Sequence, residues 1–275
     1  MNHIRSILLH LDATASSIQR LGCARRLAHR HSALLSVMYA VASSSDSSRL
    51  ALSERPGGML ETQERADLEQ ARAWFDDAMA QGGADMRWLR TDGRATVDGF
   101  IRHAMYADLL VLGQVDPQAI ESQATPAAFL ESVLIGSGRP GLILPHDGVL
   151  DVAAREPLIG WNATPAAARA VAAALPWLRQ AKRVHVLDEA GDEARDDGAL
   201  GIAGLLRLHG IDPVIHYHLD SAVTIGNSLL GLAADVHADL LVMGCYGHAR
   251  VSELVFGGAS RTVLQHMTLP VLMAT

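Results

Sequence analysis

A stretch of seven residues occurs twice in this chain, and this repetition is the strongest constraint on its fold. Ala107–Gly113 and Ala238–Gly244 agree in six of seven positions at an offset of 131 residues. Pro140 and Pro270 each precede a further pair of matching apolar runs, at an offset of 130. Self-similarity at so long a period indicates a duplicated domain. The pattern breaks between residues 146 and 156, so we predict one domain at residues 1–148 and a second at 154–275.

Short apolar runs alternate with helical patterns in both halves. Five runs read as strands in each half: Ile7–Leu11, Leu34–Val41, Met86–Leu89, Leu109–Leu112 and Leu142–Leu144, then Leu158–Trp161, Val184–Leu187, Val214–Tyr217, Leu240–Met243 and Val271–Met273. Apolar residues recur at helical spacing in Ile18–His29, Glu61–Met79 and Ala166–Leu178. Because these strands are apolar on both faces, helices must cover both sides of the sheet. The predicted fold is α/β: two tandem doubly wound, Rossmann-like domains, each with a five-stranded parallel sheet.

Composition excludes several classes of protein. A net charge of −7 argues against a general nucleic-acid binder. No apolar run approaches the ~20 residues that span a bilayer, so we expect a cytoplasmic protein with no membrane partner. The chain has two cysteines, too few for a disulfide framework or a multi-cysteine zinc site. Lys182 is its only lysine and is not preceded by glycine, which excludes the lysine-containing phosphate loop.

Glycines follow the fourth apolar run of the second half. Gly244 and Gly247 come directly after Leu240–Met243, and Gly257–Ser260 opens the next helical stretch. Glycine permits positive φ and lets an anion approach main-chain N–H groups without a Cβ in the way. The start of the following helix adds unpaired N–H groups and a partial positive charge. This arrangement indicates a phosphate-binding loop.

The whole chain resembles the universal stress protein family. The spacing Gly244-x2-Gly247-x9-Gly257 is similar to the family's ATP-binding pattern, and the tandem arrangement resembles its two-domain bacterial members. The resemblance implies that the second domain binds ATP, with or without Mg²⁺, or a related adenine nucleotide. It implies these binding residues: Asn162, Met243, Gly244, Gly247, His248, Gly257, Gly258, Ala259 and Ser260. No residue is assigned to catalysis or to a protein-held metal.

The second domain departs from the family pattern at two of these positions. Gly258 stands where the family usually has serine or threonine, which removes a hydroxyl but keeps the N–H group. Asn162 stands where the family commonly has aspartate, so it offers an acceptor and donors but no charge. We expect weakened but not abolished phosphate binding.

The first half keeps less of the pattern. Asp12 matches Asn162, and Gly113 matches Gly244, but Asp116 and Pro117 replace the second glycine and the histidine after it. A carboxylate at this place would repel a polyphosphate. We expect the first domain not to bind ATP in the family's way.

Several further features have two readings. Gly136–Gly138 looks like a glycine-serine signature, but its alignment favours a helix C-terminal stop. His216 and His218 share one strand face, as two metal ligands would, although polar alternation on an edge strand explains them equally well. Cys245 is either a redox-sensitive thiol or a small buried side chain.

Together these features predict a stress-response protein that binds an adenine nucleotide as a regulatory ligand. No nucleophile with an adjacent base is evident, so we expect no enzyme beyond slow ATP hydrolysis. We expect the edge strands Leu142–Leu144 and Val271–Met273 to pair the two halves within one chain, and a homodimer is compatible with this. Two alternatives stay open: a protein–protein interaction module that has lost its nucleotide, and a nucleotide-dependent transferase of related fold.

Overall fold

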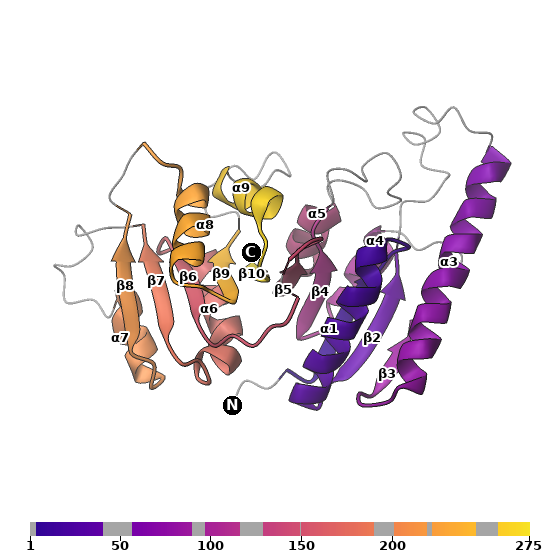
Figure 1. The fold of residues 1–275 in the computed structure, drawn as a ribbon, viewed down its shortest axis with the longest axis horizontal. Helices are drawn as coiled ribbons and strands as arrows, with labels where there is room; N and C mark the ends of the chain where they lie inside the picture. The colour runs from indigo at the N-terminus through magenta and orange to yellow at the C-terminus, as the bar shows by residue number, and fades with distance from the viewer. Residues whose placement is uncertain are drawn as a thin grey trace. The chain divides into compact units, whose positions relative to one another are not determined.

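The computed structural model describes eight stretches of the chain, and these fall into two compact units (Figure 1). The N-terminal unit is Ile4–Arg139 and the C-terminal unit is Pro140–Thr275. The described stretches are residues 4–40, 57–89, 97–115, 129–148, 150–189, 201–218, 222–245 and 258–275.

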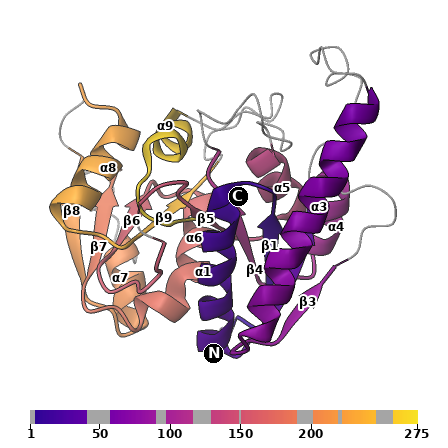
Figure 2. The same cartoon turned by 45° about the vertical axis from the view of Figure 1, so that its right-hand side comes forward.

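Within its described residues, the N-terminal unit contains a parallel sheet with the strand order β3-β2-β1-β4. The strands are β1 (Ser6–Leu11), β2 (Leu34–Tyr39), β3 (Met86–Trp88) and β4 (Leu109–Gly113). The helices are α1 (Ala15–His31), α3 (Gly57–Ala80), α4 (Val97–Ala104) and α5 (Phe129–Ser137). Figure 2 shows α1 and α3 side by side on one face of this sheet. On the opposite face, Phe100 of α4 and Phe129 of α5 contact the His10 ring of β1.

Helix α1 is amphipathic, and one polar residue lies on its buried face. The last helical residue is His31, the third of three basic residues, and the C-cap residue Ser32 ends the helix with a left-handed φ of 50°. Its buried positions recur at intervals of three and four residues, as a helix packed against a sheet requires. These positions are Ser17, Arg20, Leu21, Ala24, Leu27 and Ala28, together with Cys23 beside them. Arg20 therefore points toward the sheet and not toward solvent.

The C-terminal unit contains a sheet with the strand order β5-β10-β9-β6-β7-β8 in its described residues. The strands are β5 (Gly141–Leu144), β6 (Pro157–Trp161), β7 (Val184–Asp188), β8 (Pro213–Tyr217), β9 (Leu240–Gly244) and β10 (Val271–Ala274). The helices are α6 (Pro165–Leu178), α7 (Gly201–Leu208), α8 (Ile225–Asp235) and α9 (Gly258–His266). The strand pairings among the described residues of this unit are parallel, except that of β5 with β10.

Strand β5 comes from the first repeat in sequence but belongs to the C-terminal unit. It lies antiparallel to β10, with Ile143 opposite Val271 and Gly141 opposite Met273. The predicted pairing of these two runs is therefore confirmed. β5 also covers the edge that β10 would otherwise leave unpaired.

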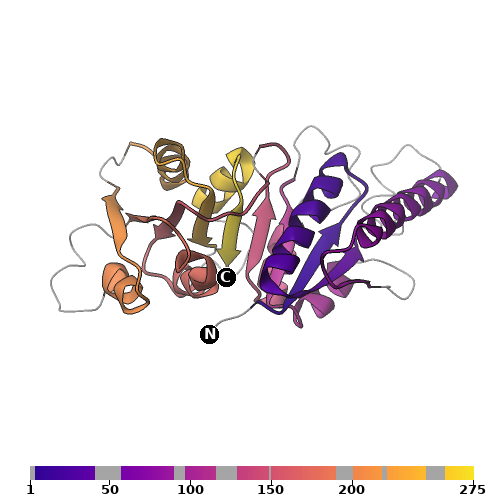
Figure 3. The same cartoon turned by 60° about the horizontal axis from the view of Figure 1, so that its bottom comes forward.

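Helices cover both faces of the C-terminal sheet (Figure 3). A Cβ on Gly160 would lie 2.9 Å from Leu229 of α8, whereas one on Gly244 would lie 2.5 Å from the Ala167 nitrogen of α6. Gly160 and Met243 are opposite each other in register, so Gly160 and Gly244 point to opposite faces. The predicted doubly wound α/β fold is confirmed. Among the described residues, no helix combines the length and apolar character needed to cross a membrane.

One sequence interpretation about helix α5 is also confirmed. The helix ends at Ser137, and Gly138 has a φ of 59° and donates its N–H to the Leu134 carbonyl oxygen at 3.1 Å. This is the geometry of a glycine that ends a helix. Residues 136–138 are therefore a helix stop and not a phosphate loop.

The place of β5 predicts how fragments of the C-terminal unit behave. A fragment of residues 140–275 should unfold at a higher urea midpoint than one of residues 154–275, because the shorter fragment exposes the apolar edge of β10. Circular dichroism during urea titration measures both midpoints. A Leu142→Pro change in the longer fragment is the matched control and should lower its midpoint, since proline removes a ladder N–H. Equal midpoints for the two fragments would show that β5 adds nothing to this unit.

Candidate functional site

The carboxyl edge of the C-terminal sheet brings together separate parts of the predicted site. β6 and β9 are neighbours in register, so Asn162, just after β6, and Gly244, at the end of β9, lie at the same edge. Helix α9 begins at Gly258 and leads back to the start of β10, which puts its N-terminus at this edge as well. In parallel α/β sheets, ligands bind at the carboxyl ends of the strands. Met243 lies one residue inside the edge and is buried.

Three predicted site residues lie outside the described part of the chain. They are Gly247, His248 and Gly257. Asp116 and Pro117, which take the corresponding places in the first repeat, lie outside it too. The roles assigned to these residues stay predictions.

Gly244 is required by close packing between strand and helix. A Cβ at this position would lie 2.5 Å from the backbone nitrogen of Ala167 and 2.7 Å from the carbonyl carbon of Ala166. Real side chains do not tolerate such distances from backbone atoms, so only glycine lets α6 approach β9 this closely. The small residues Ala166 and Ala167 complete the contact. The sequence-based role for Gly244, a turn against ribose and phosphates, is untested, and the packing role is an additional one.

Asn162 has an unused donor at the edge. Its side-chain oxygen accepts the Thr164 hydroxyl at 2.7 Å, while the Thr164 oxygen accepts the Ala167 N–H at 3.2 Å and caps α6. The Asn162 amide nitrogen has no hydrogen-bond partner among the described residues, and the side chain is half-buried. Ala163 between them has a φ of 53°, an unfavourable conformation for a residue with a Cβ. The turn therefore fixes the Asn162 side chain through its oxygen and leaves its amide nitrogen without a partner among the described residues.

The first turn of α9 is partly open. A Cβ on Gly258 would meet no atom within 4 Å, so nothing in the described structure crowds this position. Ser260 is buried at 4% exposure, and its hydroxyl has no hydrogen bond to another described residue. A Cβ on Gly226 of α8 would lie 3.0 Å from the Ala259 carbonyl oxygen, so glycine at this position lets α8 pack closely against α9. The backbone N–H groups of this turn have no partners within the helix.

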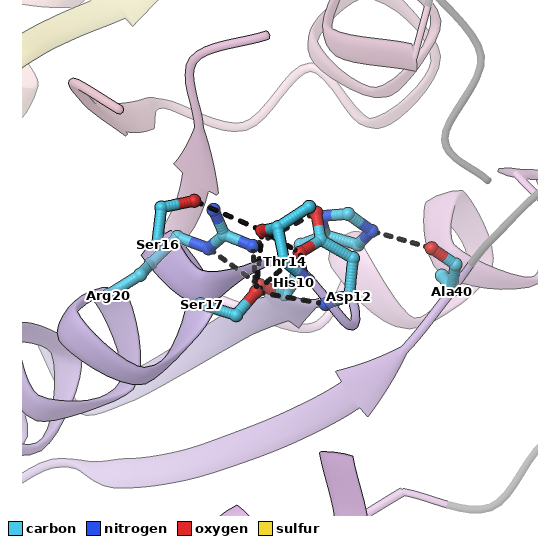
Figure 4. Close-up of polar contacts among 7 residues, drawn as sticks. All are labelled: His10, Asp12, Thr14, Ser16, Ser17, Arg20 and Ala40. Atoms are coloured by element: carbon cyan, nitrogen blue, oxygen red, sulfur yellow. Dashed lines mark hydrogen bonds and ion pairs between the residues drawn. The ribbon is translucent and has the colours of Figure 1, made fainter. Parts of the chain in front are cut away.

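The same edge of the first repeat is filled by a buried polar network (Figure 4). Asp12 follows β1 and accepts hydrogen bonds from the hydroxyls of Thr14 and Ser17, both at 2.5 Å. Its other oxygen lies 3.2 Å from the Arg20 guanidinium, which also donates to the Ser17 hydroxyl at 2.6 Å and to the His10 carbonyl oxygen at 3.1 Å. Every polar atom of the Asp12 carboxylate is therefore engaged within the unit.

Arg20 also occupies the space beside the first repeat's glycine. A Cβ on Gly113 would lie 1.9 Å from the Arg20 guanidinium nitrogen. In the second repeat, the residue at the position of Arg20 is Ala170, and the residue at that of Ser17 is Ala167. The guanidinium therefore takes a place that the second repeat leaves to small side chains.

Burial and charge shift two pKa values in this network. Burial alone would raise the pKa of Asp12, but Arg20, His10 and the two hydroxyls together hold that pKa below its usual range. Burial lowers the pKa of His10 to about 4, partly offset by the Asp12 charge, with Arg20 lowering it further. His10 is therefore neutral near pH 7, and its Nε2 lies 2.6 Å from the Ala40 carbonyl oxygen. The network carries one cation and one anion at that pH.

The other sequence candidates have structural explanations. Cys245 is 1% exposed, and its thiol donates to the Ala274 carbonyl oxygen at 3.3 Å, which favours the reading as a small buried side chain. His216 pairs with His185 of β7 at 3.0 Å between Nε2 and Nδ1. Among the described residues, no group of three or more His, Cys, Asp or Glu side chains could hold a metal ion.

Sequence reasoning missed two residues at these edges. Arg20 was detectable, because it lies at the helical spacing of the apolar positions of α1, where an unpaired charge would be costly. Glu189 follows β7 next to the end of β6, where its N–H donates to the Trp161 carbonyl oxygen at 2.9 Å. Burial, together with the neighbouring Asp188 charge, raises the pKa of Glu189 to about 7. The sequence feature that could have identified Glu189 is an acidic residue directly after an apolar strand.

Comparison with known proteins gives a family for part of the chain. The model of the universal stress protein family matches residues 159–275. No curated protein matches the chain in sequence.

Solved structures share the fold over nearly the whole chain. A universal stress protein from Archaeoglobus fulgidus superposes with a TM-score of 0.74 at 17% identity, covering 99% of this chain and 97% of that one. A putative universal stress protein from Pseudomonas aeruginosa gives a TM-score of 0.56 at 15% identity, covering 98% of this chain and 92% of that one. A functionally unknown protein from Pseudomonas aeruginosa gives a TM-score of 0.57 at 15% identity, with the same coverage. At these identities the likeness shows the fold.

The buried pair in the first repeat predicts a stability difference. Arg20→Ala should destabilise the protein by about 3–5 kcal/mol at pH 7, because it leaves the Asp12 carboxylate buried without a counterion. The double variant Asp12→Asn with Arg20→Ala copies Asn162 and Ala170, and should be more stable than the single variant. Urea unfolding at pH 7 compares them. A double variant less stable than Arg20→Ala would show that the charge pair is not the source of the loss.

His10 predicts how the N-terminal unit responds to acid. The folded state holds the pKa of His10 at about 4, below its value of 6.5 in model peptides, so as the pH falls the unfolded chain takes up a proton first. Stability contributed by neutral His10 is therefore lost between pH 6.5 and 4, roughly 2–3 kcal/mol by pH 4.5. Hydrogen exchange of β1 and β2 amides at pH 7 and 4.5, corrected for the intrinsic rates, measures the change. His10→Gln keeps an N–H donor without titrating and should show a smaller loss; an equal loss would place the titration elsewhere.

Proposed function

Residues 159–275 of this chain are a universal stress protein domain, and from that premise we propose that they bind ATP or a related adenine nucleotide as a regulatory ligand. The single observation that carries the proposal is the difference between the two carboxyl edges. In the first repeat the strand-end carboxylate is fully engaged by Arg20, Ser17 and Thr14. In the second, Asn162 keeps an amide donor without a partner among the described residues.

The first turn of α9 supports a phosphate position at the same edge. Its N–H groups have no partners within the helix, and the macrodipole favours an anion there by about 0.3–1 kcal/mol before hydrogen bonds are counted. Gly258 carries no side chain, and no described atom lies within 4 Å of its Cβ position. An anion can therefore approach the backbone at this residue. Asn162 would supply a neutral hydrogen bond to the nucleoside, and any Mg²⁺ would arrive with the phosphates.

A regulatory role fits the chemistry of the edge better than a catalytic one. Asn162, Thr164 and the first turn of α9 offer hydrogen-bond donors, but they contain no nucleophile with an adjacent base. A ligand held only by hydrogen bonds and a helix dipole shifts a conformational population without being consumed. Slow ATP hydrolysis is compatible with this assignment. The first repeat, with Arg20 at its edge, would serve as a structural or interaction partner.

Substitution of Gly258 tests the nucleotide proposal without harming the fold. Gly258→Asp puts a carboxylate at the first turn of α9, where it should weaken ATP binding by about tenfold or more through repulsion of the phosphates. The same change should stabilise the helix by about 0.3–1 kcal/mol, since an acidic residue there complements the dipole. Isothermal titration calorimetry with ATP and magnesium measures the first effect, and thermal unfolding measures the second.

The matched control is Gly258→Ser, which restores the residue type that the family usually has and should bind at least as well as the unchanged protein. ATP binding that survives Gly258→Asp unchanged would place the ligand away from α9. No binding by the unchanged protein, and no nucleotide released on denaturation, would favour the interaction module without a nucleotide. Titrations with AMP and a cyclic nucleotide distinguish the ligand. Turnover well above background would favour the enzyme reading.

A further inference from the structure

A cavity of about 130 Å³ opens on the α4 face of the N-terminal sheet, away from the edge filled by Arg20. Its lining includes Ser6 of β1, Ser36 of β2 and Arg87 of β3, which are side by side because the three strands run in parallel register. His103 and Tyr106, at the end of α4 and just after it, form the opposite wall. Ser36 is an unexpected polar residue, since the interior strands of a parallel sheet are normally apolar on both faces, whereas Arg87 is exposed on the edge strand β3.

Arg87, an exposed residue, brings a positive charge to the lining of this cavity. Its Nε donates to the Ser36 hydroxyl oxygen at 2.8 Å. No carboxylate among the described residues forms an ion pair with it. A guanidinium carries five N–H donors in a planar fork suited to oxyanions. Within the described part of the chain, the other four N–H groups of Arg87 have no hydrogen-bond partner.

Ser36 adds a buried donor next to this guanidinium. The residue is 3% exposed, and its hydroxyl oxygen accepts from Arg87. The hydroxyl hydrogen has no acceptor among the described residues, although a buried hydroxyl normally donates as well as accepts. Leaving such a donor unsatisfied is unfavourable. An acceptor inside the cavity would remove this cost.

The corresponding positions of the second repeat carry different polar residues. The register of β6 with β7 repeats that of β1 with β2, so Glu156 and His185 occupy the places of Ser6 and Ser36. There Glu156 Oε2 lies 3.6 Å from the Nε2 of His185, which is too long for a hydrogen bond, and the Nδ1 of His185 hydrogen-bonds His216 at 3.0 Å. The second repeat thus supplies its own carboxylate at a position where the first has only a serine. At the register position of Arg87 the second repeat has Val214, so the guanidinium is particular to the first repeat.

We propose that this cavity binds a phosphate group, either as inorganic phosphate or as the end of a small phosphate monoester. Arg87 and Ser36 supply donors that converge from two neighbouring strands, and a tetrahedral oxyanion has enough acceptor oxygens for both, with further ones for His103. Leu8 and Ala107 form an apolar part of the lining, which excludes water from one side of the anion. This site is in the N-terminal unit and does not rest on nucleotide binding by the C-terminal unit.

An amide NMR titration of the full chain with inorganic phosphate, at constant ionic strength, tests the proposal. Saturable shifts should appear at Leu8, Ser36 and neighbouring strand residues. Arg87→Ala and Ser36→Ala should each weaken the affinity about tenfold or more, as expected for a lost hydrogen bond to a charged group. Arg102→Ala is the matched control, because Arg102 is an exposed residue of α4 that does not line the cavity, and it should leave the affinity unchanged.

A second variant tests the comparison between the repeats. Ser6→Glu copies Glu156, so it should provide an internal partner for Arg87 and abolish the phosphate shifts while the chain stays folded. Gly258→Asp should leave the shifts in place, which separates this site from the proposed nucleotide site. A glycerol phosphate titration distinguishes a monoester from inorganic phosphate, and acetate tests whether a carboxylate suffices. Absent shifts, shifts confined to α9, or equal losses with Arg102→Ala would each overturn the proposal.

Discussion

The contact between the first helix of each repeat and the glycine that ends its fourth strand governs what the carboxyl edge can do. At Gly244, backbone atoms of α6 occupy the space that a Cβ would need, so the contact is apolar and complete. At Gly113, the Arg20 guanidinium occupies that space and must be neutralised where it lies. Asp12 neutralises this guanidinium, whereas Asn162 has no cationic partner among the described residues and keeps its amide donor. The residue that packs against this glycine therefore determines whether the carboxyl edge of a repeat is filled, as in the first repeat, or left open, as in the second.

The two repeats also differ on the other face of their sheets. At the place where the second repeat has Glu156 near His185, the first repeat has Ser6 and Ser36, with Arg87 bonded to Ser36. The polar groups that differ between the repeats thus lie at two separate places, one at the carboxyl edge and one beside the first strand. The two proposed anion sites would arise from exchange of single residues at these places after duplication of one fold.

Much of this fold followed from local pattern, and much of the site did not. The apolar runs and the repeat near Ala107 and Ala238 predicted the strands, because burial on both faces leaves a clear signal along the chain. Arg20 illustrates the limit: its spacing marks it as buried, but only the fold shows that Gly113 and Asp12 are its neighbours. The cavity beside Arg87 was invisible for the same reason, since strand register across β1, β2 and β3 is a tertiary property.

The energetics of charge burial explain why one repeat stays closed. A buried ion pair such as Asp12 with Arg20 adds little net stability over an apolar pair of similar volume, so stability alone does not account for it. A phosphate entering this edge would have to take the guanidinium from Asp12 and leave that carboxylate buried and unpaired. Breaking such a pair costs about 3–5 kcal/mol, more than the roughly 1.5–3 kcal/mol of one hydrogen bond to a charged group. We therefore propose that the first repeat excludes an anion through its own Asp12–Arg20 pair, independently of the glycines that it lacks.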